Sequence, residues 1–415
     1  MTYIKPNIKP EATNRFLIRQ ILDSGSTAAQ QQNWLEVSNQ LKLLPQSRTK
    51  LFLLEAENWH TAFNLALRML IEADFQHKWE ITKLLPLFGD EVIEPLCNLA
   101  LDEPIEVEVR WFICKVLGKF PHQRVILTLV KLLQQTTNSE LITIAEKTLI
   151  EIGDRAVDAL IDLLSQPKHR ALAVRALSYI RTSKTIAPLL EVCTADEPEL
   201  RTIAISALSS FHDARIPPVL IAALQDKASS VRREAAIALG FRADLCQEFN
   251  LITQLQPLLY DLDLEVCRQT AVSLSRMKQP EATTALFDVL QADTTPAGIK
   301  LDLIKALAWS ENASAIGYLQ QGLNNASELV VREIIVVLGR ITTPELKLLA
   351  TKALTDFWQN DRQCSSDIKQ ILATSLGQLR CNNARQVLEE IAQDSDRKVK
   401  LHALSAIRKL SNSSC

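Results

Sequence analysis

The chain has 415 residues, of which 47% are hydrophobic, and its formal net charge is −2. A charge this close to zero gives no overall field that would draw the protein to nucleic acid or to an anionic membrane. No stretch approaches the about 18 uncharged apolar residues of a transmembrane helix, and the N-terminus lacks the apolar core of a signal peptide. We therefore expect a cytoplasmic protein without membrane insertion.

The N-terminal part of the chain, before the repeats begin, predicts a short lead-in followed by three helices. Residues 1–10 are polar and contain prolines, which is typical of a flexible terminus. Apolar residues recur with helical spacing in three stretches, 11–23, 27–44 and 49–72. Ser24-Gly25-Ser26 is expected to break the first helix, and Pro45 is expected to stop the second. Because residues 11–75 lack the repeat that follows them, we interpret them as an N-terminal helical cap that covers one end of the hydrophobic core.

From residue 76 onward the chain is repetitive. A leucine within an amphipathic pattern recurs at an interval of about 32 residues, and we call it the anchor. The anchors are Leu85, Leu117, Leu149, Leu177, Leu208, Leu239, Leu274, Leu307, Leu338, Leu376 and Ile407. This spacing fits two short helices with two tight connections, so residues 76–410 predict a stack of helical hairpins. The remaining residues, 411–415, are expected to form a polar tail.

The position seven residues before the anchor is basic in eight of the eleven repeats. An aspartate often precedes this base, for example Asp226 before Arg232 and Asp394 before Lys400. An arginine at the start of one helix can bond carbonyl groups and acidic side chains of the adjacent repeat. We therefore expect these bases to form a structural ladder along the stack.

The stretch VRREAAIALG at residues 231–240 shows the repeat pattern most clearly. Ala235 and Leu239 share one helical face, and the small alanines allow a second helix to approach closely. With the preceding IPPVLIAALQD, this stretch resembles the HEAT-repeat family in its short form, and the repeat style is similar to that of phycobilin lyase subunits and related cyanobacterial proteins. The resemblance covers about residues 75–410. It implies an all-α, right-handed solenoid of about eleven HEAT-like hairpins, an armadillo-like fold that most often serves as a scaffold or adaptor.

Two positions on each second helix, six and two residues before the anchor, share one helical face and are expected to face solvent on the concave side. Neither position is acidic in any repeat. Tryptophan and arginine are enriched in interface hot spots, so this row predicts a binding surface for an acidic partner protein. The predicted partner-binding residues are Trp79, Lys83, Trp111, Lys115, Lys147, Arg175, Arg233, Arg268, Lys305 and Arg332. The alternatives are that exposed helix positions merely favour Lys and Arg, and that Trp79 and Trp111 cover the core of the first repeats.

Two repeats are longer than the others and contain insertions near 241–250 and 355–367. Insertions in solenoids usually map to loops on one face, which is often the binding face. The second insertion holds Phe357, Trp358 and Cys364. It is expected to be either a tolerated surface loop or an exposed lobe.

No residue pattern predicts a catalytic, metal or cofactor site. The eight cysteines form no CxxC-type pair and are expected to be reduced and mostly buried. The six histidines are scattered, without the HxxxH or HExxH spacing of a zinc site. The sequence also lacks a glycine-rich phosphate loop and a nucleophile with a nearby general base.

These observations predict a non-catalytic scaffold, adaptor or assembly factor that binds an acidic partner protein and needs no cofactor. The alternative implied by the resemblance is a phycobilin lyase, or a subunit of one, acting on phycobiliproteins of the phycobilisome. That activity needs an acid or a base in the groove, and the two exposed positions supply no carboxylate. A further alternative is a helper in iron–sulfur cluster or cofactor delivery that would use cysteines, of which Cys415 is expected to be the most exposed.

Overall fold

The computed structural model describes residues 10–46, 55–324 and 326–411, and every regular element within these ranges is helical. The all-α prediction is therefore confirmed. The chain divides into two compact units, residues 1–192 and 193–415. The predicted lead-in lies outside the described residues except for Pro10, which begins the first helix, and the predicted tail lies outside them except for Ser411.

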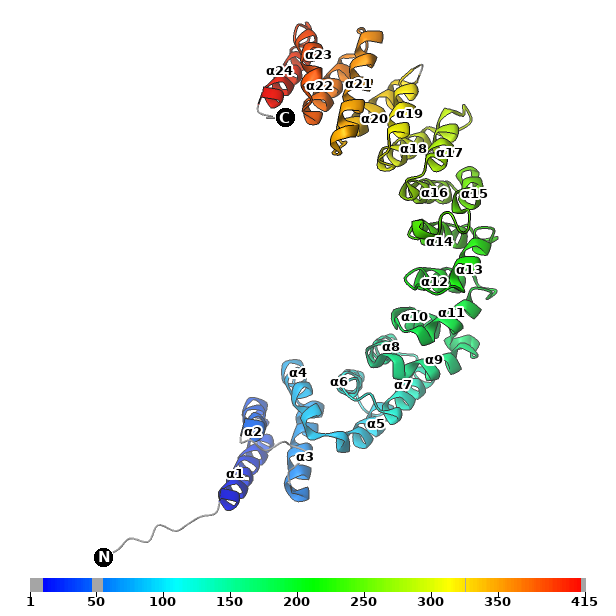
Figure 1. The fold of residues 1–415 in the computed structure, drawn as a ribbon. Helices are drawn as coiled ribbons and strands as arrows, with labels where there is room; N and C mark the ends of the chain where they lie inside the picture. Colours follow the sequence, from blue (N-terminus) through cyan, green and yellow to red (C-terminus); the bar gives the residue numbers. More distant parts are fainter. Residues whose placement is uncertain (1–9, 47–54, 325, 412–415) are drawn as a thin grey trace, which may run out of the picture. The chain divides into compact units, whose positions relative to one another are not determined.

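In the N-terminal unit the helices follow one another as antiparallel hairpins (Figure 1). They are α1 (Pro10–Gln30), α2 (Trp34–Gln46), α3 (Ala56–Glu72), α4 (Phe75–Leu84), α5 (Ile93–Leu101), α6 (Val107–Leu117), α7 (Gln123–Gln135), α8 (Ser139–Ile152), α9 (Val157–Leu164), α10 (Pro167–Tyr179) and α11 (Ile186–Val192). The second helices α4, α6, α8 and α10 pack side by side in one layer, and the first helices α5, α7 and α9 form the other layer. Hairpin α1/α2 stacks on α3/α4 in the same manner.

The C-terminal unit continues the two-layer pattern. Its helices are α12 (Pro198–Leu208), α13 (Ile216–Ala223), α14 (Ser229–Gly240), α15 (Leu251–Leu255), α16 (Leu264–Met277), α17 (Pro280–Gln291), α18 (Ala297–Trp309), α19 (Ala313–Gly322), α20 (Glu328–Gly339), α21 (Pro344–Asn360), α22 (Ser366–Leu379), α23 (Arg385–Ile391) and α24 (Arg397–Ser411). The even-numbered helices from α12 to α24 pack in one unbroken row. We call the even-numbered helices of both units the second helices. None of the helices described in either unit combines the length and apolarity needed to cross a bilayer.

The core lies between the two layers and is built on the anchors. Every anchor from Leu85 to Leu376 is completely buried. Burying a leucine side chain contributes about 1.5–3 kcal/mol to stability. Because the leucines recur regularly and each hairpin packs only on its neighbours, they form a continuous core without contacts between residues distant in the sequence. Ile407 is only half-buried because it lies in α24, the last helix of the row within the described residues.

Small residues set the distance between successive second helices. A Cβ added at Gly240 of α14 would lie 2.6 Å from Cβ and 2.9 Å from Cα of Ser273 in α16. The Ser273 hydroxyl donates a hydrogen bond of 2.8 Å to the carbonyl oxygen of Ala236 across this contact. Gly339 of α20 meets Ser375 of α22 in the same way, at 2.5 Å between the added Cβ and the serine Cβ. A larger side chain at either glycine would push the hairpins apart.

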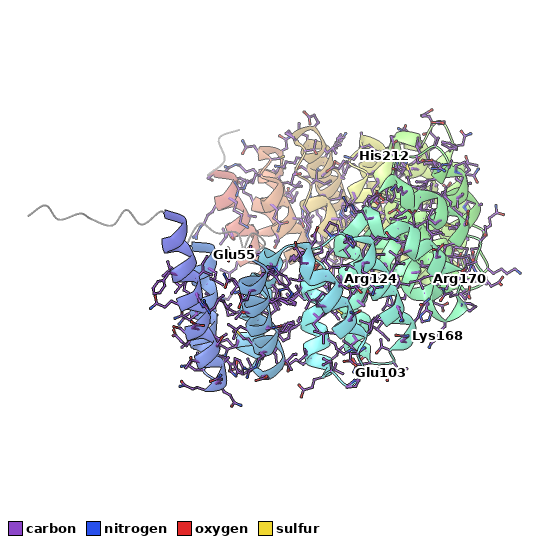
Figure 2. The ribbon with its side chains drawn as sticks, turned by 90° about the horizontal axis from the view of Figure 1, so that it is seen from below. Glu55, Glu103, Arg124, Lys168, Arg170 and His212 are labelled. Carbon is purple, nitrogen blue, oxygen red and sulfur yellow. The ribbon has the colours of Figure 1, made fainter. Side chains whose placement is uncertain are left out.

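Polar side chains also join neighbouring first helices. Arg124 of α7, labelled in Figure 2, donates hydrogen bonds of 3.0 and 2.8 Å to the carboxylate of Glu94 in α5. Both side chains are well exposed, so this ion pair adds little to stability. It contrasts with the buried ladder in the other layer, which is described below.

The predicted helix break at Ser24-Gly25-Ser26 is wrong, because α1 runs through these residues to Gln30. The Ser26 hydroxyl donates to the carbonyl oxygen of Leu22 at 2.8 Å, a bond that a helix accommodates. A Cβ at Gly25 would lie 3.2 Å from the Leu65 side chain, so this glycine allows α3 to approach. The chain turns instead at Gln32, whose φ is 55°. The third predicted helix begins at Ala56, and residues 49–54 lie outside the described ranges.

Of the two alternatives for the insertion at 355–367, the exposed lobe is wrong, whereas residues 361–365 form a short surface loop between α21 and α22. The additional residues extend α21 to Asn360, and Phe357 and Trp358 are buried at 8% and 5% exposure. The Trp358 indole donates a hydrogen bond of 3.0 Å to the carboxylate of Glu390 in α23, which satisfies its polar nitrogen. The aromatic residues of the insertion therefore belong to the core between two hairpins.

Candidate partner-binding site

The second helices present the predicted binding residues to solvent. Each of the ten residues predicted from the sequence is exposed or half-buried, as expected for the two positions before the anchor. The N-terminal unit holds Trp79, Lys83, Trp111, Lys115, Lys147 and Arg175, and the C-terminal unit holds Arg233, Arg268, Lys305 and Arg332. The predicted row is therefore divided between the two units.

The most distinctive group lies on α4 and α6, which pack side by side. The Lys115 ammonium lies 3.9 Å from the ring centroid of Trp79 and 5.4 Å from that of Trp111. Phe75 stacks on Trp79 with 6.5 Å between ring centroids. We call Phe75, Trp79, Trp111 and Lys115 the aromatic cluster. A cation held against two indole faces is attracted by their π electrons, which restrains all three side chains.

The aromatic cluster joins the core to the surface. Trp79 meets the buried ring of Phe112 edge-on, at 6.5 Å and 74°. Its own side chain is still 37% exposed, and Phe75 is 59% exposed. The rings of Phe75 and Trp111 also lie 5.2 Å from the Phe112 ring, so the alternative that the tryptophans cover the core holds in part. Phe75 and Trp79 nevertheless remain exposed, and Trp111 and Lys115 are half-buried.

The two positions themselves carry no acidic residue, but acidic residues at neighbouring positions of the second helices pair with some of the predicted bases. Lys83 binds Glu80 at 2.6 Å, and Arg175 binds Glu146 of the preceding second helix at 3.3 Å. Glu80 and Glu146 lie next to the two positions that the repeat pattern predicts to be exposed. The long side chains of Lys83 and Arg175 reach them. In the N-terminal unit the described residues place no carboxylate within ion-pair distance of Lys115 or Lys147. These two lysines therefore carry the unpaired positive charge of the row.

The C-terminal part of the row is similarly mixed. Arg268 binds both Glu265 at 3.0 Å and Asp302 at 2.8 Å. Lys305 lies 3.9 Å from carboxylate oxygens of Asp302 and Glu333. Arg233 and Arg332 make no ion pair with any residue that the structure describes.

Several of the bases seven positions before the anchor bind acidic side chains of the next hairpin, as the predicted ladder requires. Arg232 of α14 donates two hydrogen bonds of 2.7 Å to the carboxylate of Asp261 in the next hairpin, and another to the carbonyl oxygen of Asp226 in its own turn. Arg201 binds Asp226 at 2.7 Å in the same manner. The hydrogen bonds from Arg232 hold the pKa of Asp261 below its ordinary range. The ladder is therefore confirmed at Arg201 and Arg232, and Lys369 binds Asp394 at 2.8 Å in the same way. Lys300 and Lys400 make no ion pair with any residue that the structure describes.

The Glu80 carboxylate on the second-helix face suits ion pairing better than proton donation. Hydrogen bonds from Lys83 and Lys42 lower the pKa of Glu80. A general acid needs a pKa near the working pH, and a lowered pKa keeps this carboxyl ionised at neutral pH. Glu80 therefore lacks the property that a proton donor in a lyase would need.

Burial makes Cys114, Cys193 and Cys364 poor ligands. Cys97 and Cys114 lie on the two helices of one hairpin, as their spacing predicts, and both are completely buried. Burial raises the pKa of Cys114 and of Cys193 to about 12, and that of Cys364 to about 11. The thiolate is the form that binds metal, so these thiols are poorly suited to cluster delivery. The part of the chain that the structure describes holds no group of three His, Cys, Asp or Glu side chains arranged for a metal, and Cys415 lies outside it.

This assignment predicts slow alkylation of Cys114. With iodoacetamide at about pH 8, Cys114 of the native protein should react about a hundredfold more slowly than in urea, because its thiolate is both scarce and inaccessible. Mass spectrometry of tryptic peptides measures the rate, and the partly exposed Cys381 serves as an internal control. Rapid labelling of Cys114 under native conditions would contradict a buried structural thiol.

Comparison with known proteins supports the repeat assignment. Residues 157–240 match the family model for HEAT repeats. No curated protein matches the chain. One chain in a homology model of the full-length AP-3 complex is 12% identical over 98% of this chain and 83% of that chain, with a TM-score of 0.55. That likeness supports the helical-solenoid fold and carries no information about function.

Two further solved structures are similar to parts of the chain. Importin beta is 14% identical, over 97% of this chain and 62% of that chain, with a TM-score of 0.46. The complex of CpcE and CpcF of phycocyanin lyase from Nostoc sp. PCC7120 is 19% identical, over 54% of this chain and 94% of that chain, with a TM-score of 0.32.

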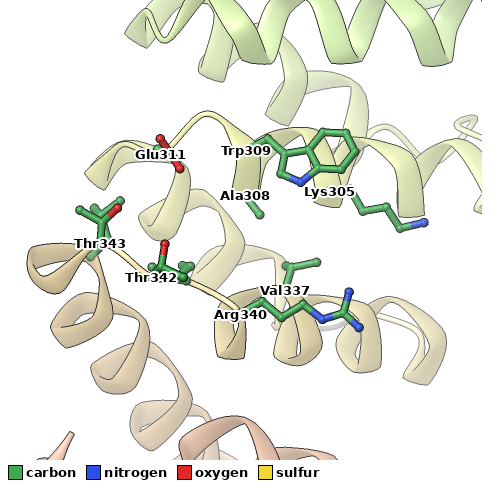
Figure 3. Close-up of a pocket in the computed structure, with 10 residues that line it drawn as sticks. Lys305, Ala308, Trp309, Glu311, Val337, Arg340, Thr342 and Thr343 are labelled. Atoms are coloured by element: carbon green, nitrogen blue, oxygen red, sulfur yellow. The ribbon is translucent and has the colours of Figure 1, made fainter. Parts of the chain in front are cut away.

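The sequence analysis missed a pocket at the C-terminal ends of the second helices. It has a volume of about 240 Å³ and is lined by residues that include Lys305, Trp309 and Arg340 (Figure 3). Trp309 and Arg340 each lie two residues after an anchor, a position that the repeat pattern does not include. Aligning the repeats at that position would have shown exposed aromatic residues at Tyr179, Phe241 and Trp309.

Proposed function

We propose that this protein is a non-catalytic scaffold or adaptor that binds an acidic surface of a partner protein. The contact surface consists of the aromatic cluster together with Lys147 on the second helices of the N-terminal unit. The observation that carries the proposal is the position of Lys115, held between the indoles of Trp79 and Trp111 without a carboxylate partner among the described residues.

Pre-organisation is the physical basis of the proposal. A free lysine loses rotamer entropy when it binds, whereas the indole faces already restrict Lys115. The tryptophan rings offer apolar area at a low entropic cost, because each has only two side-chain torsions. A partner carboxylate could therefore bond the Lys115 ammonium while apolar groups cover the exposed parts of Trp79 and Phe75.

The charge distribution favours a protein over nucleic acid as the partner. Glu80 and Glu146 alternate with the bases on this face and neutralise Lys83 and Arg175. A polyphosphate backbone requires a row of unpaired bases, and its affinity rises with every phosphate neutralised. An acidic protein patch needs only a few charges beside an apolar contact, which is what the aromatic cluster and Lys147 provide.

A phycobiliprotein is the first partner to test, because the repeats resemble those of phycobilin lyase subunits. A bilin-bearing partner would be recognised directly by its visible absorbance. Transfer of the bilin to an apo-phycobiliprotein, rather than retention of the coloured partner, would identify a lyase instead of a scaffold.

The proposal is tested by affinity purification from a lysate of the source organism, with mass spectrometry of the retained proteins. Lys115→Glu/Lys147→Glu should lower retention of the specific partner by about tenfold or more, since two favourable charges become repulsive. Lys131→Glu/Lys352→Glu carries the same change in charge at exposed positions of the first helices α7 and α21, and should bind like the wild type. Circular dichroism verifies that both variants are folded. Equal retention by the two double variants would refute this surface as the binding site.

A further inference from the structure

The second helices of the C-terminal unit end in an alternating pattern of aromatic and basic side chains. Two residues after four successive anchors stand Phe241, Arg276, Trp309 and Arg340. All four are exposed, with Phe241 at 61% and Trp309 at 56%. We call them the terminal ridge. They lie on α14, α16, α18 and α20 or directly after these helices, which pack in one row.

Contacts within the terminal ridge hold its members in place. The guanidinium carbon of Arg276 lies 4.3 Å from the ring centroid of Phe241. Trp309 and Arg340 line the 240 Å³ pocket between neighbouring hairpins, and in Figure 3 the Lys305 and Arg340 side chains extend the same way past Val337. A second pocket, of about 350 Å³, lies on the other side of Arg340.

The ridge carries positive charge that the described residues leave unpaired. Arg276 and Arg340 of the ridge, and Arg332 beside Arg340, have no carboxylate within ion-pair distance among the described residues of the unit. Glu311 lies in the Trp309 pocket but is bound to Lys278 at 2.8 Å. The second pocket is lined by two arginines, Arg332 and Arg340, and by one acidic residue, Asp367.

The spacing of the ridge fits an extended peptide. Packed helices lie about 8–10 Å apart, and an extended chain in the polyproline II conformation advances about 3.1 Å per residue with three residues per turn, so every third side chain lies on one face. Three peptide residues therefore span one hairpin. A chain laid along the ridge would bring every third side chain to a ridge member, in the order apolar, acidic, apolar, acidic.

We propose that the terminal ridge binds an extended acidic segment of a partner protein, with apolar and acidic residues alternating at every third position. Arg276 and Arg340 would each bond a carboxylate, and the guanidinium group can do so through two parallel hydrogen bonds. Phe241 and Trp309 would cover the intervening apolar side chains. This site lies in the C-terminal unit and does not depend on the aromatic cluster of the N-terminal unit.

Fluorescence anisotropy with labelled peptides tests the ridge directly in the full-length protein. The probes are Leu-Ser-Ser-Glu-Ser-Ser-Leu-Ser-Ser-Glu and the same sequence reversed, which cover both directions of binding. At least one should bind, and Trp309→Ala and Arg340→Glu should each weaken its binding by about tenfold. A version with Lys in place of Glu should not bind, and added salt should weaken the interaction.

Two matched variants control for nonspecific effects. Tyr260→Ala removes a ring that is 63% exposed at the opposite end of a hairpin, and Lys352→Glu reverses an exposed charge on the first helix α21. Both should leave peptide binding unchanged. The proposal is overturned if neither peptide binds, or if the ridge variants and the control variants bind equally well. Because the peptide probes do not involve Lys115 or Lys147, either proposal can fail without the other.

Discussion

Gly240→Val is expected to lower the free energy of unfolding by about 3 kcal/mol, since overpacking of a close contact costs up to about this much. The new Cβ would lie 2.6 Å from Cβ of Ser273, and a backbone atom of the same residue lies only 2.9 Å away. Neither atom belongs to a flexible side-chain end, so α14 and α16 have to separate. Separation would also break the hydrogen bond from the Ser273 hydroxyl to the carbonyl oxygen of Ala236.

Urea unfolding followed by circular dichroism at 222 nm measures this effect. Gly317→Ala in α19 is the matched control, because nothing lies within 4 Å of the added Cβ. Replacing glycine by alanine inside a helix should raise stability by about 0.5–1 kcal/mol. Hydrogen exchange should locate the Gly240→Val loss in α14 and α16. An unchanged midpoint for Gly240→Val would contradict the close helix contact.

Arg232→Ala is expected to lower the free energy of unfolding by about 3 kcal/mol, because it leaves a largely buried carboxylate without its charge partner. The Arg232 and Asp261 side chains are only 18% and 8% exposed, and they share two hydrogen bonds of 2.7 Å. A double-mutant cycle with Asp261→Asn isolates the interaction. The coupling energy should exceed that of the exposed pair formed by Lys184 and Asp154, which serves as the control.

The ladder also predicts how stability depends on pH. The hydrogen bonds from Arg232 lower the pKa of Asp261 from its ordinary 3.8 in the folded protein. A lowered folded-state pKa contributes stability above the ordinary pKa, and this contribution disappears as the pH falls through the folded-state value. The stability difference between wild type and Asp261→Asn should therefore be constant near neutral pH and shrink below about pH 4. A difference that grows on acidification would refute the assigned pairing.

Local patterns were sufficient to predict the repeat and its core. The regular spacing of leucines identified the anchors, which are buried from Leu85 to Leu376. The fold could be predicted because each hairpin of a solenoid packs only on its neighbours, so its requirements recur in the sequence. The same reasoning predicted a ladder between adjacent repeats, of which the Arg232–Asp261 pair is one step, and the solvent-facing position of Lys147.

The sequence pattern was less informative about partners and side-chain burial. Lys83 and Arg175 occupy the predicted exposed positions, yet Glu80 and Glu146 neutralise them. The insertion that contains Trp358 looks from the sequence like a surface loop or lobe, but the Trp358 indole is buried against α23. In each case the side chain that forms the contact lies on another helical turn or on another helix. A pattern of neighbouring residues in the sequence does not predict such a contact.

The sequence by itself determined the helical hairpins, their repeat length and the residues that form the core. Only the tertiary structure decided which charges are paired, and that Lys115 lies between Trp79 and Trp111. It also aligned Phe241 and Arg276 on neighbouring helices. The physical reason is that the burial of a side chain depends on the spacing of apolar residues within one helix. The pairing of side chains from different helices depends instead on the distance and rotation between those helices. Close contacts of small residues such as Gly240 set that distance.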